Sequence, residues 1–366
     1  MTKLLFVDDG ISFDSHSIRK KPYGGAEVAF VSLVECLSKN GFKVVVYNNC
    51  EYEGIINGVE WKKLGGSINE EVCDTLIINR GDKFLNIKKE CKNRIFWIHN
   101  PANYLIKYRY LSKLFLNNFK IVFSGEYHAS TYPFWAPAKE RVIIPYGIDN
   151  KLYNYKKIRV PPKKKVIFTS NPMRGLSWLL EMWEKNIYKR SNEAILEIFS
   201  GFETYGKFGN KHLDEISDIL KKAKSLKGLN VIVKKPLPRE KLLKELKKSR
   251  LFLYKGTSDE TYCMALAEAQ MVGLPSVVMN YGCMNERVIN NKTGYICDDD
   301  NFFCNQTIKL LNDDPLWKNM HKNALKKKNY LTWNEVVDKG EKILNFKFLI
   351  LCLLPTVVVQ RIFLRD

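Results

Sequence analysis

The chain has 366 residues, 45% of them hydrophobic and 12% aromatic, which is enough for two domains with full apolar cores. Its formal net charge of +20 has three candidate explanations. They are lysine-rich solvated helix faces, attraction to an anionic membrane surface and, least favoured, nucleic acid, for which no recognised binding motif is present.

The nine cysteines are an odd number and include no C-x-x-C pair. This pattern argues against a disulfide framework or a zinc site, and it predicts reduced, buried thiols in a cytosolic protein. The chain enters a first strand at Lys3 without an apolar signal region, so we do not expect export.

Short apolar runs in the first half predict buried parallel strands separated by helices or loops, as in a doubly wound α/β sheet. These strands are expected at residues 3–7, 43–47, 75–78, 94–98, 120–123 and 141–144. Gly24 and Gly25 open an apolar-periodic helix that extends through Leu37. Paired glycines at a helix N-terminus let a phosphate or sugar approach backbone amides, although a plain loop explains an isolated pair equally well.

Polar residues follow two of these strands. His99 comes directly after the strand expected at 94–98, and Asp8 and Asp9 follow the first strand. Ligands bind at the carboxyl ends of strands in open α/β sheets, so His99 is a candidate site residue, although a single histidine is more often structural. Asp8 and Asp9 are weaker candidates on the acceptor side.

The segment 153–165 is basic and contains Pro161 and Pro162, which is typical of a linker. We therefore place the domain boundary near residue 155. Strands are expected beyond it at 166–169, 194–200, 230–233, 251–254 and 276–279, with another near Tyr295. Arg174 begins a helix, where its charge can meet a diphosphate. The acidic run 298–300 precedes a helix, and we expect these residues to cap it rather than bind metal.

The most informative stretch is 250–282, which predicts a strand, a loop, a helix over 260–272 and a further strand. The helix is apolar on nearly every side, yet it contains Glu268. A buried carboxylate needs a partner, either an arginine from a neighbouring element or a ligand. Glu260 at the predicted helix start lies roughly 12 Å from Glu268 along the axis. That spacing suits a ligand with hydroxyls at both ends and an anionic middle, such as a nucleotide sugar.

Glu260 to Glu268 (ETYCMALAE) resembles the E-x7-E motif of retaining glycosyltransferases of family 4. Members of that family have the GT-B fold, in which two Rossmann-like doubly wound α/β domains face a central cleft. GGAE at 24–27 and PYGID at 145–149 resemble further segments of the family. The chain departs from the family pattern in two places. Thr261, Tyr262 and Cys263 stand where glycines are commonest, which resembles a subgroup with Glu-Thr-aromatic-Cys at the E-x7-E motif. Thr169 replaces a basic residue that usually precedes Arg174.

The resemblance implies a metal-independent retaining glycosyltransferase that moves a sugar from a nucleotide-sugar donor (UDP- or GDP-sugar) to a glycan or lipid-linked acceptor, with no nucleic-acid partner. It implies catalytic roles for Glu260, His99 and Arg174. It also implies a donor-binding set: Glu268, Gly24, Gly25, Thr261, Tyr262, Cys263, Met264, Pro236 and Leu237. Polysaccharide or glycolipid synthesis is the expected pathway.

The expected organisation is an acceptor-side domain at 1–155, a nucleotide-sugar domain at 156–345 and an apolar tail at 346–366. The tail contains 12 consecutive residues, 348–359, that are mostly apolar and interrupted by Pro355, whereas a membrane span needs about 20. It either packs on the first domain or enters a membrane interface, so we expect a cytoplasmic protein with peripheral membrane contact as one alternative.

Two other functions remain open from the sequence. One is a nucleotide-sugar epimerase or phosphorylase on the same fold, and the other is a basic binding protein without catalysis.

Overall fold

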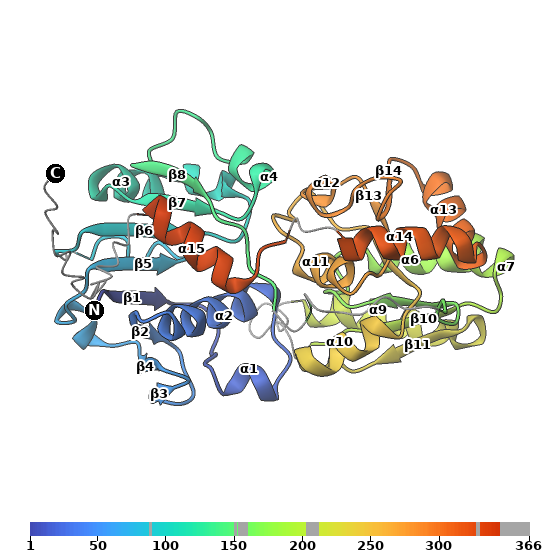
Figure 1. Ribbon diagram of the computed structural model, residues 1–366, viewed down its shortest axis with the longest axis horizontal. Helices are drawn as coiled ribbons and strands as arrows, with labels where there is room; N and C mark the ends of the chain where they lie inside the picture. The colour runs from blue at the N-terminus through green and yellow to red at the C-terminus, as the bar shows by residue number, and fades with distance from the viewer. Residues whose placement is uncertain (88–89, 150–151, 153–159, 203–211, 327–329, 345–366) are drawn as a thin grey trace, which may run out of the picture.

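The computed structural model describes residues 1–87, 90–149, 152, 160–202, 212–326 and 330–344. Two α/β domains lie side by side, and each is built on one largely parallel sheet (Figure 1). This confirms the two doubly wound domains expected from the strand pattern. The predicted domain boundary near residue 155 and the tail at 346–366 lie outside the described residues.

The first sheet has the order β3-β4-β2-β1-β5-β6-β7-β8, and all neighbours are parallel except β3 and β4. Its strands are β1 (Lys3–Asp8), β2 (Lys43–Asn48), β3 (Gly54–Ile56), β4 (Val59–Lys63), β5 (Thr75–Asn79), β6 (Asn93–Trp97), β7 (Lys120–Phe123) and β8 (Glu140–Ile143). The helices around it are α1 (Ser17–Lys20), α2 (Gly25–Lys39), α3 (Tyr108–Asn117) and α4 (Glu126–Ser130), with 3-10 turns η1 (Gly66–Asn69) and η2 (Ala102–Ile106).

The second sheet has the order β11-β10-β9-β12-β13-β14 and is parallel throughout. Counted from β9, this is the Rossmann order 3-2-1-4-5-6, and the first sheet repeats it from β4 to β7. The strands are β9 (Lys165–Phe168), β10 (Ile195–Phe199), β11 (Val231–Lys234), β12 (Leu251–Tyr254), β13 (Ser276–Met279) and β14 (Gly294–Cys297).

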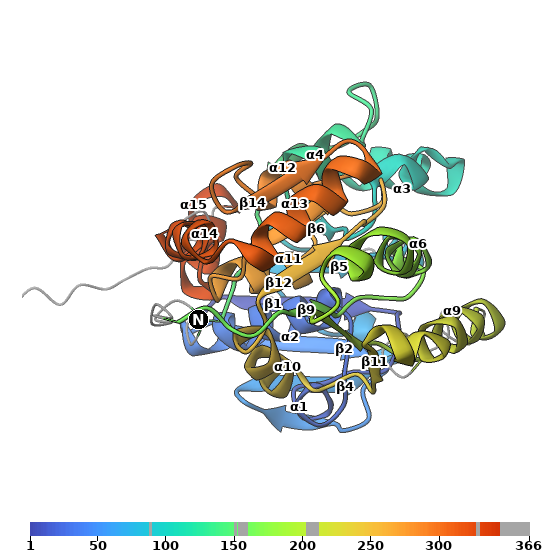
Figure 2. The same cartoon turned by 90° about the vertical axis from the view of Figure 1, so that its right-hand side faces the viewer.

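Helices of the second half cover this sheet (Figure 2). They are α6 (Leu176–Met182), α7 (Tyr188–Arg190), α9 (Leu213–Ser225), α10 (Arg239–Lys247), α11 (Met264–Met271), α12 (Met284–Arg287), α13 (Asp300–Asn312) and α14 (Asp314–Lys326), with η3 (Trp183–Ile187), a π-helical turn, and η4 (Leu226–Leu229). The strands predicted from apolar runs agree with those observed to within a residue or two. The hairpin β3–β4 was missed because β3 is short and mostly exposed, and β4 has only two buried apolar residues, Val59 and Trp61.

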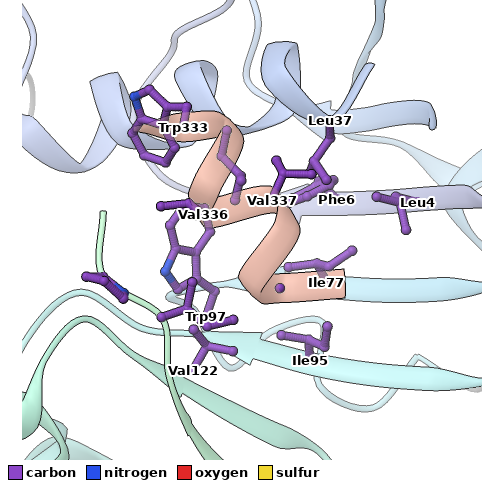
Figure 3. A pocket seen from close by; sticks show the side chains of 14 residues that line it. Leu4, Phe6, Leu37, Ile77, Ile95, Trp97, Val122, Trp333, Val336 and Val337 are labelled. Atoms are coloured by element: carbon purple, nitrogen blue, oxygen red, sulfur yellow. The ribbon is translucent and has the colours of Figure 1, made fainter. Parts of the chain in front are cut away.

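The last described helix, α15 (Trp333–Leu344), falls in the sequence range expected for the second domain but packs on the first, against α2 (Figure 1). The chain returns to the first domain just before α15, where the Ile148 amide donates a hydrogen bond to the Leu331 carbonyl at 2.8 Å. An apolar cavity of about 60 Å³ remains between α15 and the sheet, and Phe6, Trp97 and Gly340 are among its lining residues (Figure 3).

Eight cysteines lie in the described residues and all are free thiols. Seven are buried, as predicted, and Cys91 is half-buried. Cys352 lies outside the described residues.

We predict that Gly340→Ala raises the free energy of unfolding by about 0.5–1 kcal/mol. Alanine loses less backbone entropy in a helix, and a Cβ at Gly340 meets no atom within 4 Å. Gly147→Ala is the matched control, because its Cβ would lie 2.8 Å from the Cα of Trp333 and should destabilise the contact with α15. Urea denaturation measures the free energy of unfolding of both variants. Destabilisation by Gly340→Ala would contradict this packing of α15.

Candidate active site

A cleft of about 320 Å³ lies between the two domains. The first domain contributes the start of α2 and His99, which follows β6, and the second contributes Thr169 after β9, Tyr254 at the end of β12, and α11. The carboxyl ends of parallel strands from both sheets therefore meet at one site. This is the position where open α/β sheets bind ligands.

The helix of the E-x7-E segment is shorter than predicted. It begins at Met264, and Glu260 lies in the loop before it, so the predicted axial spacing of the two glutamates does not apply. Cys263 precedes the helix in the left-handed conformation, with φ of 56°. A non-glycine residue adopts this conformation at a cost, so other contacts must hold the loop.

Those contacts come from the first domain. The Thr261 hydroxyl donates to the His99 carbonyl at 2.5 Å, and the Tyr262 hydroxyl donates to the Tyr146 carbonyl at 2.7 Å. The Thr261 carbonyl accepts a hydrogen bond from the Ser124 hydroxyl at 3.1 Å. The Thr-Tyr-Cys segment, which departs from the commonest family form, thus ties the two domains together at the cleft.

Glu260 is buried and shared by two partners. Arg174 forms an ion pair with its Oε1 at 2.7 Å, and the hydroxyl of Tyr254 donates to the same oxygen. Burial and the carboxylate hold the pKa of Tyr254 well above its usual value, so this hydroxyl stays protonated and remains a donor. Arg174 and Glu260 both line the cleft, as predicted for catalytic residues, and they contact each other there.

Glu268 forms an ion pair with Arg239, Nε to Oε1 at 2.8 Å. Burial raises the pKa of Glu268, and the positive charge of Arg239 opposes that rise. Glu268 therefore has the structural partner that the sequence left open, an arginine from a neighbouring element. This arginine is the first residue of α10. Sequence reasoning missed Arg239. The available signal was an arginine in the first turn of a helix, where the dipole disfavours positive charge.

His99 is enclosed by hydrogen bonds on both ring nitrogens. The amide nitrogen of Asn79 donates to Asp8, so its Oδ1 accepts from Nε2 of His99 at 2.6 Å. Nδ1 of His99 then accepts from the hydroxyl of Tyr146. Burial, with Arg80 and His128 nearby, holds the pKa of His99 well below its usual value, so the imidazole is neutral. His99 lines the cleft through its ring and not through a free nitrogen.

The glycine pair also lies in the cleft. Gly24 is the N-cap of α2, and a Cβ on Gly25 would stand 2.9 Å from the Cβ of Met264. Glycine at 25 therefore permits the close approach of the two domains.

Most of the predicted donor-binding residues line the cleft, whereas Pro236 is not among its lining residues. Those that do are Gly24, Gly25, Leu237, Thr261, Tyr262, Cys263, Met264 and Glu268. Asp8 is also absent from the lining, and its carboxylate instead pairs with Arg80 at 2.9 Å. The hydroxyl of Thr169 faces this site without a hydrogen-bond partner among the described residues.

The acidic run 298–300 caps a helix, as predicted. The Asp299 carboxylate accepts from the amide of Phe302 at 2.7 Å at the start of α13. Within the described ranges, three or more His, Cys, Asp or Glu side chains do not gather into a metal-ligand group. Nor does any described helix have the length and apolarity needed to cross a membrane.

Comparison with solved structures shows that this two-domain arrangement is the GT-B fold of glycosyltransferases. Anabaena HepE in complex with UDP-glucose is 13% identical with a TM-score of 0.72, covering 94% of this chain and all of that one. WaaG, a glycosyltransferase of lipopolysaccharide biosynthesis, is 11% identical with a TM-score of 0.68 at the same coverage. Sucrose-phosphate synthase from Thermosynechococcus elongatus is 12% identical with a TM-score of 0.68, covering 94% of this chain and 98% of that one.

A family model also matches part of the sequence. Residues 155–327, just under half of the chain, match the sequence model of the family described as "Glycosyl transferases group 1". None of the curated proteins gives a significant match.

The buried neutral histidines predict a pH dependence of stability. His99 and His128 have lowered pKa values, that of His128 to about 4, mainly through burial. Because the unfolded histidines take up protons below about pH 6.5 and the folded ones do not, the free energy of unfolding falls with pH from 6.5 toward 4. Each histidine contributes at most about 1.4 kcal/mol per pH unit.

Urea denaturation across this pH range measures the effect. His128→Asn should lower the slope between pH 6.5 and 5 by up to about 1.4 kcal/mol per pH unit, and an unchanged slope would contradict the buried neutral state.

Proposed function

We propose that the protein is a retaining glycosyltransferase that takes its sugar from a UDP-sugar bound in the interdomain cleft. The observation that carries the proposal is the pairing of both E-x7-E glutamates with arginines, Glu260 with Arg174 and Glu268 with Arg239, beside the N-terminus of α11. HepE, the GT-B neighbour described above, binds UDP and UDP-glucose, which favours UDP over GDP.

In this proposal the donor lies along α11. The diphosphate rests on the first amides of the helix, near Met264, and on the guanidinium of Arg174. The ribose hydroxyls bind Glu268, and the transferred sugar lies beside Glu260 and the ring of His99. Both ring nitrogens of His99 are occupied, so we assign it a positioning contact with the sugar and no proton transfer.

The proposed reaction is a front-face displacement. The acceptor oxygen bonds to the anomeric carbon while the bond from that carbon to the phosphate oxygen breaks, and the acceptor proton passes to the departing phosphate. The protein orients the two substrates and stabilises the leaving group through Arg174 and the helix amides, without a metal. The acceptor is a glycan or lipid-linked sugar at the cytoplasmic membrane surface, in polysaccharide or glycolipid synthesis.

Arg239 is proposed as the substitute for the basic residue absent at Thr169. Arg239 lines the same cleft, and its ion-pair partner is Glu268, the residue proposed to bind the ribose. When the ribose hydroxyls bind Glu268, Arg239 gains a second anionic partner in the diphosphate. A buried arginine shared by two anions avoids being left unpaired.

We predict that UDP and UDP-sugars raise the melting temperature more than their GDP and ADP counterparts do. Glu268→Gln keeps the side-chain volume but weakens donor affinity by about tenfold or more, because hydrogen bonds to a charged group contribute about 1.5–3 kcal/mol. Glu184→Gln, distant from the cleft lining, is the matched control. A purely structural role for Glu268 would lower the melting temperature of the free protein and leave the UDP-induced shift unchanged.

Glu260→Gln should lower turnover more than it lowers donor affinity, because Glu260 holds Arg174 beside the leaving group. Transfer from a labelled UDP-sugar, followed by NMR of the product, measures rate and anomeric configuration, and activity should survive EDTA. An inverted product would contradict retention. Epimerised or phosphorolysed donor would instead support the alternative reactions.

Arg239→Ala should weaken UDP binding by at least about tenfold, and Arg239→Lys should restore part of it, because the charge is retained without the planar fork. The affinities of UDP and uridine, measured by calorimetry, separate the roles. If Arg239 contacts the diphosphate, its replacement weakens the binding of UDP more than that of uridine. An equal loss of affinity for both ligands would contradict this contact.

A further inference from the structure

Two cysteines of the first domain precede neighbouring strands by the same number of residues. Cys73 lies two positions before Thr75, the first residue in the paired register of β5, and Cys91 lies two positions before Asn93, the first residue of β6. Strands β5 and β6 are parallel neighbours, and Thr75 pairs with Asn93. The register therefore places Cys73 beside Cys91 at the amino end of the sheet, on the side away from the second domain (Figure 1).

Backbone hydrogen bonds continue this register up to the cysteines. The Asp74 carbonyl accepts from the Lys92 amide at 2.8 Å, and the Asp74 amide donates to the Lys3 carbonyl at 2.9 Å. Neighbouring strands lie about 4.8 Å apart, and a disulfide requires Cα atoms about 4.4–6.8 Å apart. The Cys73 thiol donates a hydrogen bond to the Cys91 sulfur, and both side chains pack against the same apolar cluster. The two thiols are therefore within reach of each other for a disulfide without movement of the sheet.

The ionisation of Cys91 differs from that of the six described cysteines outside this pair. The hydrogen bond from Cys73 and the positive charge of Arg94 lower the pKa of the Cys91 thiol to about 6, although burial opposes them. The guanidinium of Arg94 is fixed there, because it donates to the Ile87 carbonyl at 2.9 Å and lies over the ring of Phe119. Burial raises the pKa of each of the other six thiols. At neutral pH Cys91 is therefore mostly a thiolate, which is the nucleophilic form of cysteine.

The pair is also accessible from solvent. A surface cavity of about 370 Å³ is lined by Cys73, Asp74, Glu90, Cys91 and Lys92, and Cys91 is half-buried whereas Cys73 is buried. Packing alone explains a buried, protonated cysteine, but it does not explain a thiolate at an open cavity next to a second thiol. A metal site is not supported either, because the residues that the structure describes contain no group of three or more His, Cys, Asp or Glu side chains.

We propose that Cys73 and Cys91 form a redox pair, which hydrogen peroxide oxidises to a reversible disulfide within the chain. The Cys91 thiolate attacks one peroxide oxygen, the O–O bond breaks, and the products are a sulfenic acid at Cys91 and hydroxide. The sulfur of Cys73 then attacks the sulfur of Cys91, and the displaced hydroxyl leaves as water with the proton of the Cys73 thiol. The two cysteines are oxidised by two electrons in total, and the peroxide is reduced to water.

The disulfide joins β5 and β6 at their amino ends. At the carboxyl ends of the same strands, Asn79 and His99 are joined by a hydrogen bond of 2.6 Å, and His99 lines the cleft. The residues that line the cysteine cavity do not overlap with those that line the cleft. Oxidation should therefore stabilise the first domain, because it closes a short loop in the unfolded chain, and leave the cleft residues in place. The proposal does not depend on the proposed reaction.

The test is oxidation of the folded full chain with hydrogen peroxide, followed by alkylation of the remaining thiols and mass spectrometry of the peptides. We expect a linked peptide that contains Cys73 and Cys91, lacks two hydrogen atoms relative to the reduced pair and disappears with dithiothreitol. The oxidised protein should melt several degrees higher than the reduced protein.

Two variants separate the steps. Cys73→Ser keeps a hydroxyl donor beside the thiolate but removes the second sulfur, so Cys91 should remain a sulfenic acid that dimedone labels. Cys50→Ser is the matched control, because it removes another thiol of the first domain, one that is buried and has its pKa raised to about 11. The control should form the same disulfide as the parent.

The parent chain alone decides the proposal, so the test does not require a variant that folds. Complete alkylation of Cys73 and Cys91 after peroxide treatment would overturn it, as would a disulfide between either of them and another cysteine. A sulfenic acid at Cys91 of the parent without the linked peptide would show a single oxidisable thiol and overturn the pair. Preferential dimedone labelling of another cysteine in Cys73→Ser would contradict the assignment of Cys91 as the attacking thiolate.

Discussion

The cleft depends on hydrogen bonds that the Thr261–Tyr262 segment forms with the first domain. Thr261 and Tyr262 donate to the carbonyls of His99 and Tyr146, which follow strands of the first sheet. Buried hydroxyls need such partners, and the carbonyls beyond the strand ends need donors. By satisfying both, the segment holds Cys263 in the left-handed conformation and starts α11 at Met264. The positions of Met264 and Glu268 in the cleft follow from that start.

The second constraint is the balance of charge in the cleft. Two buried carboxylates would be costly alone, and each has an arginine within an ion-pair distance. Arg174 comes from the segment before α6, and Arg239 from the start of α10. The site is thus preorganised and internally neutral, and an anionic ligand can exchange for a carboxylate at each arginine. A neutral His99, locked between Asn79 and Tyr146, completes the wall without adding charge.

Much of the fold was predictable because parallel strands buried on both faces leave continuous apolar runs. Residues 75–79 and 251–254 are buried throughout, and the sequence locates both. The helix predicted to begin at residue 260 begins four residues later, at Met264. Apolar periodicity contains no information on hydrogen bonds to residues more than a hundred positions away in the chain. Arg239 was missed for a related reason, since only the folded chain brings α10 beside Glu268. The location of α15 on the first domain also depends on contacts that no local pattern encodes.

The sequence by itself determined the two largely parallel sheets and the resemblance carried by Glu260 and Glu268, and most of the site residues that it named line the cleft. These are local properties, since burial and spacing are written in runs of a few residues. Only the tertiary structure decided which charges pair, that Thr261 and Tyr262 join the domains, and that both nitrogens of His99 are occupied. Those outcomes depend on distances between elements that are far apart in the chain, and distance in space decides both ion pairing and hydrogen bonding.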